Sequence, residues 1–104
     1  PMRTTFHHPH GYHAARSEQD VEARLAAVLD RFQDAITSVH VTMEDLNGQK
    51  GGVDKSCKLE LHGSFETVVV TATHEHILGA VDAAVHKAAT AVDRARKRHQ
   101  EHRG

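Results

Sequence analysis

The residues Val21–Met43, VEARLAAVLDRFQDAITSVHVTM, decide the fold because the hydrophobic spacing changes within them. Up to Ile36 apolar residues recur every three or four positions, the spacing of one face of an amphipathic helix. After Ser38 the spacing becomes two, which is typical of a half-buried strand. The apolar helical positions are Val21, Leu25, Val28, Leu29, Phe32 and Ile36. We therefore predict a helix from Ser17 to Ile36 and a strand over Ser38–Leu46.

Two more strands are predicted after this pair. The segment Asn47–Gly52 contains three glycines and indicates a loop. Polar and apolar residues then alternate around Cys57–Leu61, Gly63 and Ser64 indicate a turn, and Thr67–Thr73 is rich in valine. Three consecutive strands with such connections predict an antiparallel meander.

The two ends of the chain add one strand and one helix. Alternation over Met2–His8 predicts a first strand, and a loop over His8–Arg16 follows it. A second helix is predicted over Ile77–His99, in an alanine-rich segment. Its apolar positions are Leu78, Val81, Val85, Ala88 and Val92.

The resulting order is strand, helix, strand, strand, strand, helix, which predicts an α+β fold of β-α-β-β-β-α type. Both helices then pack on one face of a four-stranded sheet. A right-handed first crossover makes the first strand parallel to its neighbour. We expect residues 2–104 to form a single domain.

The composition is that of a soluble globular protein located in the cytoplasm. The 104 residues are 38% hydrophobic and 26% charged, with a net charge of −1. No apolar run is long enough to span a membrane, and the first 20 residues have no hydrophobic stretch of the signal-peptide type. A single cysteine, Cys57, excludes an internal disulfide and a zinc site built from cysteines alone.

The charges are distributed unevenly along the chain. Residues 94–104 carry five cations against one acid, whereas Ser17–Leu46 carries seven acids against two cations. A second helix of about 35 Å would extend past strands of about 20 Å. We expect this helix to be solvated on all sides beyond Val92, so that its basic end is available to phosphates. The alternative is that these cations complement the negative end of the helix dipole and keep it soluble.

The loop Asp45–Cys57, DLNGQKGGVDKSC, has the pattern D-x-N-G-x-x-G-G-x-D-K-x-C. Four helix and strand segments accompany it: VEARL from Val21, DRFQDAI from Asp30, VHV from Val39 and AVDAAV from Ala80. The loop and these segments resemble a short branch of the ribosome hibernation promoting factor family, also called ribosome-associated inhibitor A or sigma-54 modulation protein.

The resemblance implies the same β-α-β-β-β-α fold and a role at the small ribosomal subunit. Binding to ribosomal RNA in the channel for messenger and transfer RNA would inhibit translation under stress or in stationary phase. The resemblance implies phosphate contacts, for which we select Lys87, Arg94, Arg96, Lys97 and Arg98, with Lys50, Lys55, Lys58, Arg24 and Arg31 as further candidates. We expect no DNA partner and no cofactor.

Metal binding and catalysis are less well supported by the sequence. The histidines considered as metal ligands are His7, His8, His10, His13, His74 and His76. The first four flank a strand end and a loop without a cysteine or paired acid at fixed spacing, so we predict no metal site. Cys57 shares the parity of Leu59 and Leu61 and is expected in the core, and no group of residues indicates an enzyme.

Two alternative functions stay open from the residues. One is a divergent paralogue that binds another RNA or a protein through the exposed sheet face. That face would present His40, Thr42, Lys58, Glu60, His62 and Thr67. The other alternative is a histidine-rich metal-binding protein. The oligomeric state is not indicated by the sequence.

Overall fold

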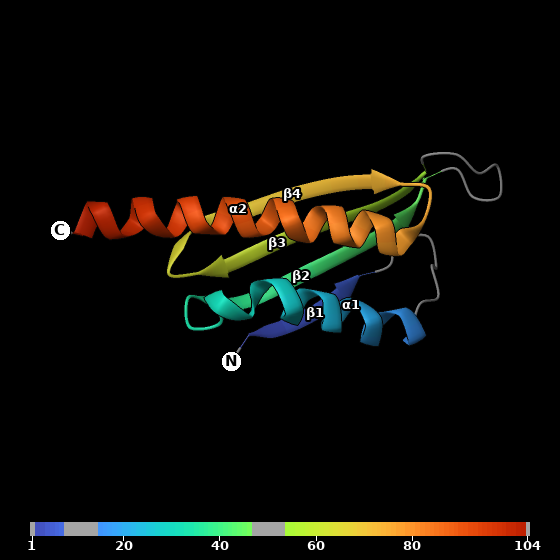
Figure 1. Ribbon diagram of the computed structural model, residues 1–104, viewed down its shortest axis with the longest axis horizontal. Helices are drawn as coiled ribbons and strands as arrows, with labels where there is room; N and C mark the ends of the chain where they lie inside the picture. Colours follow the sequence, from blue (N-terminus) through green and yellow to red (C-terminus); the bar gives the residue numbers. More distant parts are fainter. Residues whose placement is uncertain (1, 8–14, 47–53, 104) are drawn as a thin grey trace.

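The computed structural model describes residues 2–7, 15–46 and 54–103. Its elements follow the predicted order (Figure 1), and their bounds are β1 (Arg3–His7), α1 (Ala15–Leu29), η2 (Asp30–Phe32), β2 (Ile36–Asp45), β3 (Lys55–Gly63), β4 (Phe65–His74) and α2 (Ile77–Arg103). The fold is therefore the predicted α+β arrangement.

The four strands form one sheet in the order β1-β2-β3-β4. β1 pairs in parallel with β2, as predicted from a crossover through α1, and the other two pairings are antiparallel. Both helices lie on the same face of the sheet, and they run in the same direction (Figure 1).

The core lies between the helices and this face of the sheet. α1 contributes Val21, Leu25 and Leu29, none of which is accessible to solvent. Alternate residues of the strands face them, including Val41 from β2 and Cys57 from β3. Burial raises the pKa of the Cys57 thiol to about 12, because a thiolate would lose its hydration there. Cys57 is thus a core residue, as its parity with neighbouring leucines predicted.

The prediction that the first helix continues to Ile36 is wrong. α1 ends at Leu29, and a 3-10 turn over Asp30–Phe32 follows, in which the Gln33 N–H donates to the Asp30 carbonyl oxygen over 3.0 Å. Phe32 and Ile36 are both buried nonetheless, the latter as the first residue of β2. The 3-10 turn directs Phe32 into the core, and the start of β2 does the same for Ile36, without a continuous helix.

The turn between β3 and β4 packs against this region. Ser64 N–H donates to the Ala35 carbonyl oxygen over 2.9 Å. A Cβ atom on Gly63 would lie 1.9 Å from the same oxygen, so a side chain cannot fit at this position. The close approach of the two chain segments therefore requires glycine.

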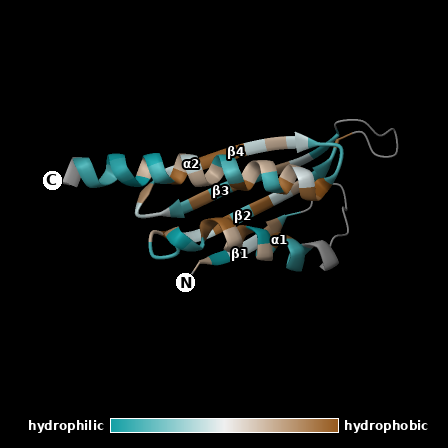
Figure 2. Cartoon of the chain, in the orientation of Figure 1, coloured by the Kyte–Doolittle hydropathy of each residue, from teal (hydrophilic) through white to brown (hydrophobic). Residues whose placement is uncertain are grey.

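The last turns of α2 extend past the strands and past α1 (Figure 1). Hydrophilic residues surround this end of the helix (Figure 2). The apolar stripe continues one turn further than predicted, since Ala95 is only 3% exposed and Arg96 is half-buried. The prediction of complete solvation beyond Val92 is thus wrong by one turn, and Arg96 is partly covered because its guanidinium group lies over the Phe32 ring of η2. From Lys97 to Glu101 every residue is exposed.

In the part of the chain that the structure describes, no helix covers the opposite face of the sheet (Figure 1). We call it the open sheet face. Its side chains follow from the strand register and include Arg3, Thr5, His40, Thr42, Lys58, Glu60, His62, Val69 and Thr71. None of the helices among the described residues has the length and apolar character needed to cross a membrane.

Candidate nucleic-acid interface

The exposed cations at the end of α2 form the strongest candidate for a phosphate-binding surface. Three of these cations lie on consecutive turns and are exposed: Arg94, Lys97 and Arg98. We call them the C-terminal cationic surface. Within the described residues, Arg94 and Arg98 make no hydrogen bond or ion pair. Glu66 and Arg98 both line a cavity of about 170 Å³ without pairing there. Two guanidinium groups are therefore available to an external anion.

A neighbouring carboxylate holds two cations of the same helix, Arg96 and, from the C-terminal cationic surface, Lys97. Arg96 Nη2 lies 3.1 Å from Asp93 Oδ1, and Lys97 Nζ lies 3.1 Å from Asp93 Oδ2. The hydrogen bonds from Lys97 and then from Arg96 lower the pKa of Asp93 below its ordinary value. These contacts orient Arg96 and Lys97 along the helix and neutralise part of their charge.

The ring of Phe32 supports two guanidinium groups at the same end of the molecule. The Cζ atoms of Arg31 and Arg96 lie 4.5 and 5.6 Å from the ring centroid. Both distances are within the range of a cation–π interaction. In the sequence Phe32 is one position of an apolar stripe, which predicts a core residue and carries no sign of this second role.

A cavity of about 300 Å³ adjoins these two guanidinium groups. It is lined by Arg31, Phe32, Asp34, Ala35, Ser64, Arg96, His99 and Gln100. The Nε atom of Arg96 is buried and has no hydrogen-bond partner among the described residues. The cavity thus combines an aromatic ring with two cations, which are the groups that contact bases and phosphates in RNA-binding proteins.

Two other predicted cations make contacts with the protein itself. Arg24 Nε lies 2.9 Å from Asp82 Oδ1, so this arginine joins α1 to α2. Lys87 Nζ donates to the backbone oxygen of Thr71 over 2.8 Å. Because β4 is at the edge of the sheet, this contact occupies a carbonyl that another strand would otherwise pair with.

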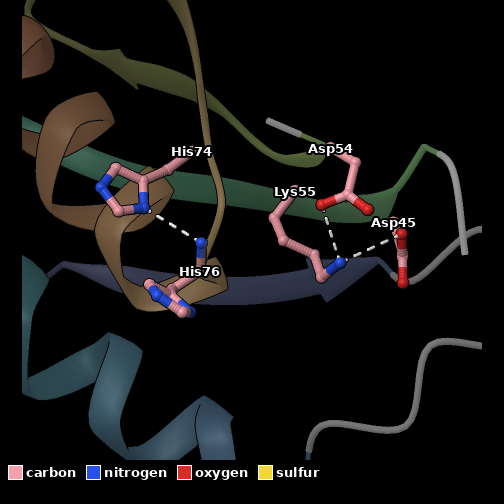
Figure 3. Close-up of polar contacts among 5 residues, drawn as sticks. All are labelled: Asp45, Asp54, Lys55, His74 and His76. Atoms are coloured by element: carbon pink, nitrogen blue, oxygen red, sulfur yellow. Dashed lines mark hydrogen bonds and ion pairs between the residues drawn. The ribbon is translucent and has the colours of Figure 1, made fainter. Parts of the chain in front are cut away.

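The start of β3 lies at the opposite end of the molecule from the end of α2 (Figure 1), and Lys55 is its first residue. Its Nζ lies 2.8 Å from Asp54 Oδ1 and 3.3 Å from Asp45 Oδ1, as Figure 3 shows. The hydrogen bond with Asp54 raises the pKa of Lys55. The Leu46 N–H also donates to the Asp54 carbonyl oxygen over 2.7 Å. Together these contacts join the end of β2 to the start of β3.

The remaining candidates are separate from the C-terminal cationic surface. Lys58 is exposed on the open sheet face, away from both helices. Lys50 lies outside the described residues, as does most of the loop that carries the sequence signature. Of the ten predicted cations, the structure thus gathers five near one end: Arg31, Arg94, Arg96, Lys97 and Arg98.

The histidines considered as metal ligands do not converge in the described residues. His8, His10 and His13 lie outside these residues, and His7 is exposed on β1. His74 Nδ1 accepts a hydrogen bond from the His76 backbone N–H over 3.0 Å (Figure 3). The His74 ring also packs against Gly79, where a Cβ atom would lie 2.3 Å from Nδ1. This histidine therefore orders the start of α2.

Comparisons with known proteins agree with the fold. The family model described as Sigma 54 modulation protein / S30EA ribosomal protein matches residues 7–100. No curated protein sequence matches the chain.

Two of the solved structures that share the architecture align over most of this chain. One is the N-terminal domain of Protein Y from Thermus thermophilus, with 26% identity, a TM-score of 0.72, and coverage of 89% of this chain and 98% of that one. The other is a ribosomal subunit interface protein from Coxiella burnetii, with 16% identity, a TM-score of 0.68, and coverage of 89% and 93%.

Proposed function

Because the chain belongs to the Sigma 54 modulation protein / S30EA ribosomal protein family, we propose that it binds ribosomal RNA of the small subunit and inhibits translation under stress or in stationary phase. Under this proposal residues 2–104 act as one domain in the cytoplasm. The chain works by occupying a binding site and not by catalysing a reaction.

The observation that carries this proposal is the exposure of Arg94 and Arg98 without a partner among the described residues. A cation already paired with a carboxylate must break that pair before it binds a phosphate, which offsets part of the gain. Arg94 and Arg98 have no ion pair to break within the described residues, so none of their binding energy is lost in this way. Each can make two parallel hydrogen bonds with a phosphate and release counterions from the RNA.

The cavity beside Phe32 supports binding to RNA in particular. Its aromatic ring and the guanidinium groups of Arg31 and Arg96 form a partly apolar, positively charged recess next to the exposed arginines. An unstacked base can pack against such groups while its phosphate contacts the helix. The cavity and the C-terminal cationic surface would then bind the same RNA strand.

The acidic character of the first helix limits where the RNA lies. Exposed Asp20 and Glu22 are on α1, and Arg24 of the same helix is paired with Asp82. A phosphate backbone would be repelled from this part of the helical face. We therefore propose that the contact is concentrated at the end of α2 and does not extend along both helices.

A cell-free translation assay tests the inhibition. The purified chain should reduce protein synthesis, and the double variant Arg94→Glu/Arg98→Glu should require at least tenfold more protein for the same effect. The matched control is Arg3→Glu/Lys58→Glu, which reverses two exposed cations on the open sheet face. It should inhibit as the unmodified chain does. Failure of the unmodified chain to inhibit, or loss of inhibition in the control alone, would contradict the proposal.

A further inference from the structure

Three metal-ligating side chains meet on the open sheet face. His40 comes from β2, and Glu60 and His62 come from β3. The register places His40 directly opposite Glu60, with His62 opposite Ser38 two residues further along the same face. Each of the three offers one ligand atom, and these atoms all lie within 4.8 Å of one another. We call this group the His40–Glu60–His62 cluster.

Pairing of the strands fixes the arrangement. Side chains directly opposite each other on antiparallel strands have Cβ atoms about 5 Å apart, and residues i and i+2 of one strand share a face. His62 Nε2 donates to Glu60 Oε2 over 2.7 Å. The rings of His40 and His62 lie edge to face, with centroids 5.5 Å apart. The three side chains therefore converge without any movement of the backbone.

Two threonine hydroxyls orient the imidazole rings. Thr5 Oγ1 on β1 is hydrogen-bonded to His40 Nδ1, and Thr67 Oγ1 on β4 lies 3.2 Å from His62 Nδ1. In both rings Nδ1 thus has a hydrogen-bond partner, and Nε2 is the second nitrogen. In His62 the Nε2 proton is the one donated to Glu60, so a metal ion bound between these two side chains would displace that proton. Because a hydroxyl can donate or accept, it can also accept the Nδ1–H of a histidine that binds a metal through Nε2.

We propose that the His40–Glu60–His62 cluster binds a divalent transition-metal ion, with Zn²⁺ as the representative. Two imidazole nitrogens and one carboxylate oxygen are ligands suited to such ions, whereas Mg²⁺ and Ca²⁺ prefer oxygen alone. Tetrahedral coordination with bonds of 2.0–2.1 Å places ligand atoms about 3.3 Å apart. His40 is exposed, so rotation of its side chain can close the remaining gap. Water would complete the coordination from the open side.

All four strands contribute to this site. β1 contributes Thr5 and β2 contributes His40. β3 contributes Glu60 and His62, and β4 contributes Thr67. The site lies on the face opposite the helices (Figure 1). It therefore does not share residues with the C-terminal cationic surface, and the proposal does not depend on RNA binding.

Calorimetric titration with Zn²⁺ tests the site. The full chain should be used in a background with His7, His8, His10 and His13 changed to Asn, because the loop histidines are a separate source of binding. We expect one equivalent of Zn²⁺ per chain, with affinity reduced at least tenfold by His40→Ala or by His62→Ala. His86→Ala, which removes an exposed histidine of α2, is the matched control and should bind normally. Mg²⁺ in excess should not compete.

The histidine ring nitrogens give a second readout that does not depend on stoichiometry. On addition of Zn²⁺, the NMR signals of Nε2 in His40 and His62 should shift, while those of His86 stay in place. Circular dichroism should show that each variant retains the fold. The proposal is overturned if Zn²⁺ does not bind, if His40→Ala and His62→Ala bind as tightly as the background chain, or if neither ring nitrogen responds.

Discussion

Arg96 Nη2 lies 3.1 Å from Asp93 Oδ1, one helical turn away on α2. This contact divides the cations of the helix end into two groups. Arg96 and Lys97 are held by the carboxylate of Asp93, whereas Arg94 and Arg98 have no partner among the described residues. The second group is the one that we expect to make the first contacts with phosphate.

The Asp93 contacts predict a pH-dependent contribution to stability. The pKa of Asp93 is lowered in the folded chain, so its contribution is present above its ordinary value near 3.8 and is lost as the pH falls through the folded pKa. Urea denaturation of the unmodified chain and of Asp93→Asn should therefore give free energies of unfolding that differ at pH 7 and converge as the pH falls through the lowered pKa of Asp93. A difference that stays constant with pH would contradict this explanation.

Phe32→Leu tests the cation–π contacts separately from burial. Leucine keeps an apolar side chain in the core but removes the ring beneath Arg31 and Arg96. We expect a loss of about 1–2 kcal/mol in the free energy of unfolding from the lost ring contacts and imperfect packing. Binding to the small subunit should also weaken, because the two guanidinium groups lose their orientation. Unchanged RNA affinity would show that the cavity does not take part.

Lys55→Met tests the contacts at the other end of the molecule. Asp54 is completely buried, so removing its partner leaves a carboxylate without a cation. The melting temperature should fall further than in Lys58→Met, which removes an exposed lysine from the same strand. The raised pKa of Lys55 means that its contribution persists below pH 10.5 and is lost as the pH rises through the folded pKa. Equal melting temperatures for the two variants would contradict this role.

Cys57 should react slowly with thiol reagents in the folded chain. Its pKa is raised from 9.0 to about 12, which lowers the thiolate fraction at pH 8 roughly thousandfold. Burial adds a steric barrier. The rate of reaction with a disulfide reagent should rise by at least that factor when urea unfolds the chain. A fast reaction under native conditions would show that the thiol is accessible.

Most of the fold was predictable because its periodicities are local. The change of spacing between Val21 and Met43 is contained in one segment and does not depend on distant residues. The end of the first helix was not predictable in this way, since Phe32 and Ile36 keep helical spacing while a 3-10 turn separates them. The partial burial of Arg96 likewise depends on the ring of Phe32, more than sixty residues away in sequence.

The candidate sites were less predictable, because they depend on pairing across strands and helices. His40 and His62 are far apart in sequence, and only the register of β2 with β3 brings them together. The pairing of Arg24 with Asp82 joins two helices, so one of the predicted RNA-binding cations is already engaged within the protein. The cluster of cations around Arg94 in the sequence identifies the correct end of the molecule. It does not show which of these cations are already paired.

Co-sedimentation with isolated small ribosomal subunits tests the central claim most directly. We expect the unmodified chain to bind, with affinity that falls as salt rises, and Arg94→Gln/Arg98→Gln to bind more weakly and to lower the salt slope by about two. Arg3→Gln/Lys58→Gln should bind like the unmodified chain. Equal binding and an equal salt slope for the Arg94→Gln/Arg98→Gln variant and the unmodified chain would contradict the account.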